Sequence, residues 1–328
     1  MPSPATRKLD QGRRPSIGAG ALSPSPLSLT GFPTSSSSAT QQAGITTAAG
    51  GVPVAVVEPP APVKQELSVI EKSKRLAAWT AVDHHIHEEH KVIGIGSGST
   101  VPYVVERIVQ QGEKLNHERV FLPTGFQSKE LIVKANLRLG DVDQYPSIDV
   151  TIDGADEVDH DLNCIKGGGA CHLREKVLAE AAETWIVVAD YRKNSDVLGT
   201  TYKQGVPIEV APFAYAKLLQ NVHLLGSENA CLRMAKGGKA GPVVTDNGNF
   251  VIDAPFDEEM MRDPHELLTK IKMLTGVVEV GLFCHMAQAA YFGNADGSVT
   301  IKWHDGRVEQ VKGTELDESP VDSKSNAQ

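Results

Sequence analysis

Hydrophobic residues take on a helical spacing where the chain stops being dominated by small and polar residues. Leu76, Trp79, Val82 and Ile86 are three to four positions apart, which predicts an amphipathic helix with one face packed on a core. Beyond it, short apolar runs alternate with helical patterns. The predicted strands are 92–95, 120–122, 148–152 and 185–189, and the predicted helices are 103–110, 127–137 and 171–182. This alternation predicts a parallel sheet covered on both faces.

After residue 200 the order of the predicted elements changes. Strands are predicted at 206–210, 231–235, 242–245, 250–253 and 277–283, with helices at 212–224 and 264–274. Asn247-Gly248 is a hairpin turn signal. When the arms of this hairpin are counted as one strand, four strands remain and the order is roughly β-α-β-β-α-β. This is the split βαβ arrangement of a small α+β domain. A last pair of strands, 289–292 and 298–303, is predicted to return to the first sheet.

These elements predict an α/β protein with two domains. Residues 66–203 and 287–312 would form a Rossmann-like, mostly parallel sheet domain, and 204–286 a smaller, ferredoxin-like α+β domain. Residues 1–65 are rich in Ser, Pro, Ala, Gly and Thr and contain only two acids, so they are predicted to be disordered. Residues 313–328 are predicted to be a polar tail.

Composition narrows the class of protein. The chain has 328 residues, of which 41% are hydrophobic, and a net charge of −9, whereas nucleic-acid binders usually present a basic surface. No apolar run approaches the roughly 18 residues that span a bilayer. We expect a soluble, cytoplasmic protein with no nucleic-acid or membrane partner. Import into an organelle stays open, because the Ser-rich, acid-poor leader also fits a transit peptide. The four cysteines lack a CxxC pair, which favours reduced thiols.

The first candidate site is the glycine-rich turn 94–100, which follows a predicted strand and opens a helix. Glycines allow close approach of a ligand, the helix N-terminus offers free N–H groups, and Ser99 and Thr100 add hydroxyl groups. The turn therefore predicts a phosphate site. The alternatives are a turn needed only for packing, or a dinucleotide site. A dinucleotide site would require an acid at the end of the second strand, where the sequence has Leu122-Pro123-Thr124.

The second candidate site is the acidic run that ends the strand 148–152. Asp153 and Asp156 would lie at the carboxyl edge of the sheet, where open α/β sheets bind ligands. Two acids around a glycine suit a hydroxylated substrate. A solvated acidic turn and a metal site are the alternatives, although no His or Cys lies close in sequence.

Two further segments bring positive charge and a carboxylate to the same edge. Lys166 precedes three glycines, whose backbone a ligand can approach closely, and Glu175 follows in the next helix. Lys193 follows the strand 185–189. Taken alone, Glu175 and Lys193 would be ordinary surface residues. The group His84, His85, His87 and His90 suggests a metal site but is better explained as the polar end of a helix.

Together these motifs resemble the ribose-5-phosphate isomerase A family. The matching segments are GIGSGST, IDGADEVD, IKGGGACHLREK, VVADYRK, VPIEVAPFAY, GPVVTDNGNF and GVVEVGLF, in order from about residue 70 to 302. The composite is closest to the animal-type members. The resemblance implies interconversion of ribose 5-phosphate and ribulose 5-phosphate in the non-oxidative pentose phosphate pathway, without metal or organic cofactor, by a homo-oligomer, either a dimer or a tetramer.

The resemblance also implies roles for residues. The proton-transfer glutamate falls on Glu175. The substrate-binding segments fall on Ser97, Gly98, Ser99 and Thr100, on Asp153, Gly154, Ala155 and Asp156, on Lys166, Gly167, Gly168 and Gly169, and on Lys193.

These roles make chemical sense for an aldose–ketose isomerase. Such an enzyme needs a base that moves a proton from C2 to C1 through an enediolate. Glu175 would be that base, Asp153 would handle protons on oxygen with help from Asp156, and Lys166 or the glycine loop would stabilise the enediolate. Which of Lys166 and Lys193 meets the phosphate stays open.

Two rival functions remain at this point. A nucleotide-dependent dehydrogenase could use a similar sheet, and a sugar-phosphate-sensing module could keep the phosphate turn. The sensing module would lack the base, so Glu175 argues against it.

Overall fold

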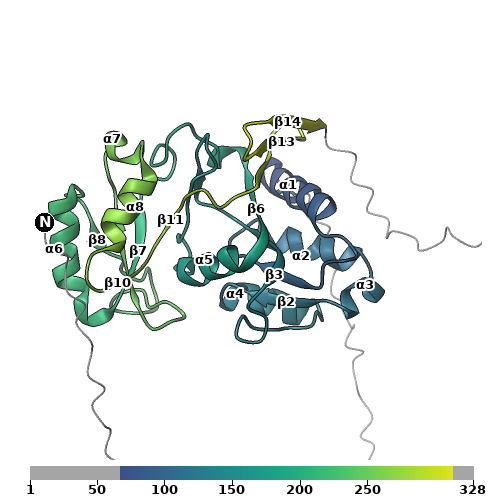
Figure 1. Cartoon of the computed structure of the whole chain (residues 1–328), viewed down its shortest axis with the longest axis horizontal. Helices are drawn as coiled ribbons and strands as arrows, with labels where there is room; N and C mark the ends of the chain where they lie inside the picture. The colour runs from purple at the N-terminus through teal and green to yellow at the C-terminus, as the bar shows by residue number, and fades with distance from the viewer. Residues whose placement is uncertain (1–66, 313–328) are drawn as a thin grey trace, which may run out of the picture. The chain divides into compact units, whose positions relative to one another are not determined.

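The computed structural model describes residues 67–312 (Figure 1). The predicted disordered extension and the predicted polar tail lie outside the described residues. None of the helices in the described part of the chain has the length and apolar character needed to cross a membrane.

The larger sheet has seven strands, of which the first five are parallel. Its order is β2-β1-β3-β6-β12-β13-β14, and β13 and β14 run antiparallel to their neighbours. The bounds are β1 Val92–Ile95, β2 Val120–Pro123, β3 Ile148–Asp153, β6 Ala182–Asp190, β12 Ala289–Gly293, β13 Ser298–Trp303 and β14 Val308–Lys312. The predicted parallel sheet is confirmed, and so is the return of the last strands to it.

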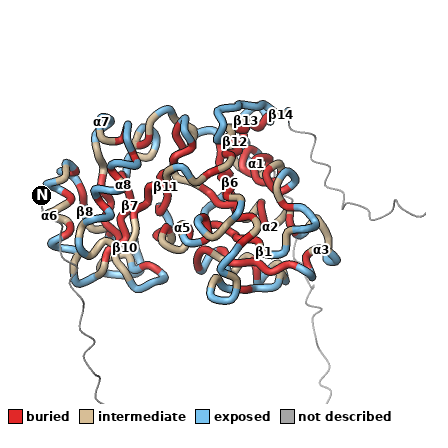
Figure 2. The backbone as a smooth tube through the Cα atoms, in the orientation of Figure 1, coloured by how far each residue is buried: buried red, intermediate tan, exposed pale blue. Residues whose placement is uncertain are grey.

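Helices cover both faces of this sheet, as the alternation predicts. They are α1 Val69–His85, α2 Val101–Gln110, α3 Glu113–His117, α4 Phe126–Lys134 and α5 His172–Ala181. Along β6, Ile186 and Val188 join the core under α1 and α2, whereas Trp185 and Val187 join a second core on the other face. Figure 2 shows buried residues along β6 and β12. Burial on both faces explains why these strands are continuous apolar runs.

The connections around β1 create a crevice at one edge of the sheet. From β1 the chain goes to β2 on one side, and it then returns to β3 on the other side. The loops that follow β1 and β3 therefore leave the carboxyl edge in opposite directions. Such a switch point is where open α/β sheets bind ligands.

The smaller sheet has four strands in the order β10-β7-β9-β8, and all neighbours are antiparallel. Its strands are β7 Val206–Val210, β8 Cys231–Leu232, β9 Phe250–Ala254 and β10 Val277–Val280, and its helices are α6 Tyr215–Leu225, α7 Glu258–Met261 and α8 Pro264–Lys272. The chain order is β-α-β-β-α-α-β, which differs from the predicted β-α-β-β-α-β only by the short additional helix α7. Since the boundaries between the two domains rest on sequence alone, they stay a prediction.

Three predicted strands are wrong in detail. The strand predicted at 231–235 is shortened to β8, Cys231–Leu232. Residues 242–245 form no strand, because Gly237, Gly238 and Gly241 have positive φ and break the chain into turns. The run 277–283 is divided at Gly281, where a Cβ would lie 2.1 Å from the carbonyl oxygen of Lys166. Its second part, β11 Leu282–Phe283, instead joins β4 Glu157–Val158 and β5 Cys164–Ile165 in a three-stranded sheet.

Candidate active site

A cavity of about 330 Å³ opens at the carboxyl edge of β1, β3 and β6. The glycine loop between β5 and α5 forms one of its walls. The residues predicted from the sequence that line it are Ser97, Gly98, Ser99, Thr100, Gly154, Ala155, Asp156, Lys166, Gly167, Gly168, Gly169, Glu175 and Lys193. Four segments far apart in the sequence are thus brought together as predicted, and Asp153 alone of the predicted set lies beneath the lining.

Asp153 ends β3 and is fully buried. Its Oδ1 accepts hydrogen bonds from the N–H groups of Ser97, at 2.9 Å, and Gly154, at 2.7 Å. A Cβ on Gly96 would lie 2.0 Å from the same oxygen, so only glycine allows this approach. Asp153 therefore joins the loop after β1 to the loop after β3.

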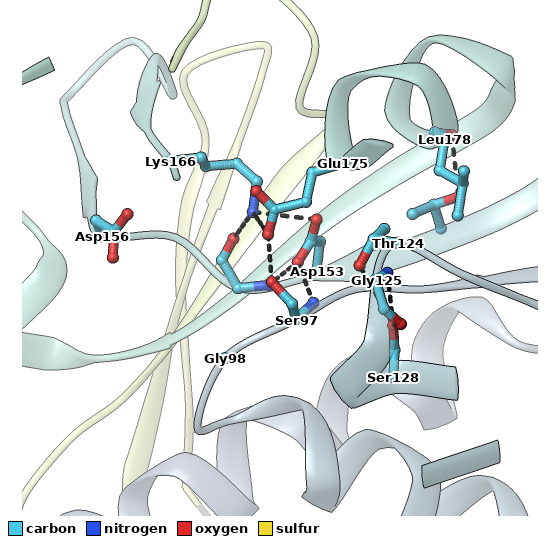
Figure 3. A network of polar contacts seen from close by, with 12 residues as sticks. Ser97, Gly98, Thr124, Gly125, Ser128, Asp153, Asp156, Lys166, Glu175 and Leu178 are labelled. Atoms are coloured by element: carbon cyan, nitrogen blue, oxygen red, sulfur yellow. Dashed lines mark hydrogen bonds and ion pairs between the residues drawn. The ribbon is translucent and has the colours of Figure 1, made fainter. Parts of the chain in front are cut away.

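Lys166 follows β5 and places a buried cation beside two carboxylates. Its Nζ lies 3.0 Å from Asp153 Oδ2 and 3.3 Å from Glu175 Oε1, and it donates a hydrogen bond to the carbonyl oxygen of Gly154. Burial alone would lower the pKa of Lys166, but the charges of Asp153 and Glu175 raise it above its usual value. Lys166 is therefore a fixed positive charge. Figure 3 shows Lys166 and Glu175 pointing toward each other.

Glu175 lies in the first turn of α5 and is 3% exposed. Its Oε1 accepts a hydrogen bond from Ser97 Oγ at 2.5 Å, whereas its Oε2 has no hydrogen-bond partner within residues 67–312. Burial raises the pKa of Glu175 to about 7, against the opposing effects of Lys166 and Ser97. A carboxylate with one fixed oxygen, one free oxygen and a pKa near neutrality is suited to accept and return a proton.

Asp156 faces the cavity and holds the glycine loop. Its Oδ2 accepts a hydrogen bond from the N–H group of Gly168 at 2.7 Å. A Cβ on Gly168 would lie 2.5 Å from Asp156 Oδ1, which explains the glycine there.

The predicted phosphate turn precedes α2 and forms another part of the lining. Gly98 has φ +99°, and its N–H donates to Gln127 Oε1 at 2.9 Å. The N-terminus of α2 follows directly, with its partial positive charge. Lys193, in the short 3₁₀ turn after β6, adds a half-buried cation.

Sequence reasoning missed several lining residues. They are Phe126, Gln127, Cys171, Ala189, Asp190 and Asp246. Asp246 comes from a turn of the smaller sheet, and its Oδ2 accepts a hydrogen bond from the N–H of Phe126 at 2.9 Å. The sequence marks this turn only as an Asn-Gly hairpin turn, and nothing in the local sequence indicates that it reaches the cavity.

The histidine group does not contribute to the cavity. His84 Nδ1 and His85 Nε2 lie 3.1 Å and 2.8 Å from the hydroxyl oxygen of Tyr291, and the rings of His87 and His90 pack 5.5 Å apart. Among the residues that line the cavity, none comes from this group.

Comparisons with known proteins identify what the chain is similar to. The family model described as ribose 5-phosphate isomerase A (phosphoriboisomerase A) matches residues 120–297. Curated ribose-5-phosphate isomerases from Cryptococcus neoformans and Schizosaccharomyces pombe are 68% and 59% identical over 273 and 239 residues. These alignments cover 81% and 73% of this chain, and 88% and 86% of the relatives.

Two solved structures also resemble the chain. One is a D-ribose-5-phosphate isomerase in complex with phospho-erythronic acid, with a TM-score of 0.63 and 35% identity over 74% of this chain and 99% of that one. The other is the ribose 5-phosphate isomerase from Plasmodium falciparum, with a TM-score of 0.62 and 33% identity over the same shares.

Proposed function

Because the chain belongs to the ribose-5-phosphate isomerase A family and is a ribose-5-phosphate isomerase, we propose that Glu175 is the base that moves the proton between C2 and C1. One observation carries this proposal. Glu175 lines the cavity, with one oxygen held by Ser97 and Lys166 and the other buried and without a partner among the described residues.

In this mechanism, the free oxygen of Glu175 takes the proton from C2 of the open-chain aldose. The electron pair of the C–H bond forms the C1–C2 double bond, and the carbonyl oxygen at C1 becomes an oxyanion. The fixed ammonium group of Lys166, which is itself buried, stabilises this enediolate. The proton on O2 passes to the oxyanion at O1, the electron pair left on O2 forms the C2 carbonyl, and Glu175 returns its proton to C1 to give the ketose.

The two aspartates are proposed to have different roles. Asp153, which the sequence suggested for proton transfer at oxygen, is fully buried and bonded to Ser97, Gly154 and Lys166. We therefore assign it the positioning of Lys166. Asp156 lines the cavity and is left to meet the hydroxyl groups of the sugar.

The phosphate is proposed to bind between the turn Ser97–Thr100, the N-terminus of α2 and Lys193. The cavity lining contains two lysines, and Lys166 is already engaged by two carboxylates. This leaves Lys193 for the phosphate. Anchoring the far end of the sugar uses remote binding energy to orient the reacting carbons.

Replacing Lys193 by Met is expected to lower kcat/KM roughly tenfold and to weaken inhibition by inorganic phosphate, because a close opposite charge is lost. Steady-state kinetics with phosphate as the inhibitor measures both effects. Lys203→Met is the control, since Lys203 is exposed and bonds only to the carbonyl oxygen of Gly199 among the described residues. An unchanged inhibition constant for phosphate in Lys193→Met would contradict the assignment.

The activity should rise with pH through about 7, because Glu175 accepts a proton only when it is deprotonated and burial raises its pKa to about 7. The acidic limb of kcat/KM against pH measures this. Ser97→Ala removes a hydrogen bond to the charged carboxylate, so its limb should move to higher pH. Two results would argue against Glu175 as the base. One is an acidic limb in the parent whose apparent pKa is that of an ordinary carboxylate, and the other is an acidic limb in Ser97→Ala at the same pH as in the parent.

The activity itself is tested by ribulose 5-phosphate formation from ribose 5-phosphate in the presence of a chelator. No turnover by the full chain under these conditions would contradict catalysis by the protein side chains alone. We also propose that the protein is located in the cytoplasm and that it assembles as a homo-oligomer. These two proposals rest on the acidic composition and on the family resemblance. A fluorescent fusion of residues 1–65 and a sedimentation measurement would test them.

A further inference from the structure

Arg233 connects the smaller sheet to the glycine loop of the active site. It directly follows β8, and its backbone is bonded to Val251, at 2.8 Å, and Val243, at 2.9 Å. Its side chain is buried, and Nη1 donates hydrogen bonds to the carbonyl oxygens of Gly167 at 2.8 Å and Gly168 at 3.1 Å. Both glycines line the cavity.

Asp253, on β9, fixes the direction of the guanidinium group. Arg233 Nε donates to Asp253 Oδ2 at 2.8 Å, and Nη2 donates to Oδ1. Gln204 Nε2 donates to the same Oδ2 at 2.8 Å, so the carboxylate is itself held. A two-bond pairing between a planar guanidinium and a carboxylate allows little rotation. Nη1 is therefore directed at the glycine loop from a rigid support.

The glycine loop has no side chains with which to fix itself. Gly167 has φ +105°, a conformation that glycine adopts freely, so neighbouring groups must select it. Arg233 holds the carbonyl oxygens of the loop, and Asp156 holds the N–H of Gly168 from the cavity side. Lys166, next in the chain, is anchored by its N–H to the carbonyl oxygen of Gly281 at 2.9 Å.

We propose that Arg233, held by Asp253, is a positioning residue for the isomerisation, because it sets the glycine-loop wall of the cavity and thereby the placement of Lys166. Arg233 lies outside the cavity lining and acts through the loop. The proposal rests on the function proposed above for Lys166. It predicts that loss of Arg233 harms the chemical step more than the binding of phosphate.

The test compares Arg233→Met with Arg119→Met in the full chain. Arg119 is a matched control, because it is also buried and also donates to a carbonyl oxygen, that of His87, at 2.8 Å. Arg119 directly precedes β2 and therefore lies at the amino end of this strand, whereas the cavity lies at the carboxyl ends of the strands. Arg233→Met is expected to lower kcat roughly 10²-fold while inhibition by inorganic phosphate changes less than about twofold. Arg119→Met should lose stability but keep its kcat.

Two further measurements keep the proposal falsifiable if Arg233→Met folds poorly. Arg233→Lys keeps the charge but loses the forked pairing, so it should have a kcat between those of the parent and Arg233→Met. Added guanidinium at millimolar concentration should raise the kcat of Arg233→Ala and leave that of Arg119→Met unchanged. Parent-like kcat in folded Arg233→Met or Arg233→Lys, absence of rescue, or equal loss of kcat in the Arg119 control would overturn the proposal.

The outcomes also separate this inference from the assignment of the base. If Glu175→Gln keeps its turnover while Arg233→Met loses it, the base assignment fails and the positioning role stands. If Glu175→Gln loses turnover and Arg233→Met does not, only the positioning role fails.

Discussion

Glu175→Gln is expected to lower kcat for ribulose 5-phosphate formation by roughly 10²- to 10⁴-fold, with little change in KM. The amide keeps the size of the side chain and can keep a contact to Ser97, but it cannot accept the proton from C2. Steady-state kinetics measures the effect. Glu180→Gln is the control, since Glu180 lies on the same helix and is exposed.

The stability of Glu175→Gln separates lost chemistry from lost folding. Burial raises the pKa of Glu175 from 4.5 to about 7, so between these values the folded protein binds more protons at this site than the unfolded chain does. This site's contribution to stability therefore falls as pH rises from 4.5 to 7 and is unfavourable above that range. The variant should be at least as stable as the parent at pH 8. Full turnover in the variant would contradict the role of Glu175.

Lys166→Met is expected to abolish measurable turnover and to lower the free energy of unfolding by about 3–5 kcal/mol, because it leaves two buried carboxylates without their cation. Asp153 and Glu175 would then repel each other without the cation that lies between them. Kinetics together with denaturant unfolding measures both losses.

Lys176 offers a matched control for this variant. It is largely buried, lies 2.8 Å from Glu279 and donates to the carbonyl oxygens of Val280 and Leu282, but it does not line the cavity. Lys176→Met should lose stability of a similar size and retain turnover. Retained turnover in Lys166→Met, or equal loss of turnover in both variants, would contradict the role of Lys166 at the enediolate.

The sequence predicts the parts of the site that follow from strand ends. Ser97, Asp153 and Lys193 each come after or at the end of an apolar strand, and parallel strands bring their carboxyl ends to one edge. These strands can be recognised in the sequence as continuous apolar runs, because both faces of the sheet are buried. The third sheet was not predicted, since its strands have only two residues each and carry no periodic pattern.

Other features of the site depend on where a side chain points and on which distant segment it contacts, and the sequence pattern shows neither. Asp153 was expected to face the substrate, but Gly96 lets the loop after β1 close over it, so that it points to Lys166 and not into the cavity. Arg233 and Asp246 reach the site from the smaller sheet, far along the chain from the loops that they contact. These contacts result from packing between the two sheets, and no local sequence motif predicts them.

The return of β12 to the larger sheet bears on how the protein folds. β12 pairs in parallel with β6, although the whole four-stranded sheet is synthesised between them. Until β12 emerges, β6 is an uncovered apolar edge, which is a template for pairing with other chains. Contacts between such distant segments form slowly. We therefore expect closure of the larger sheet to be the late step of folding, and chains caught before it to be those that aggregate or need a chaperone.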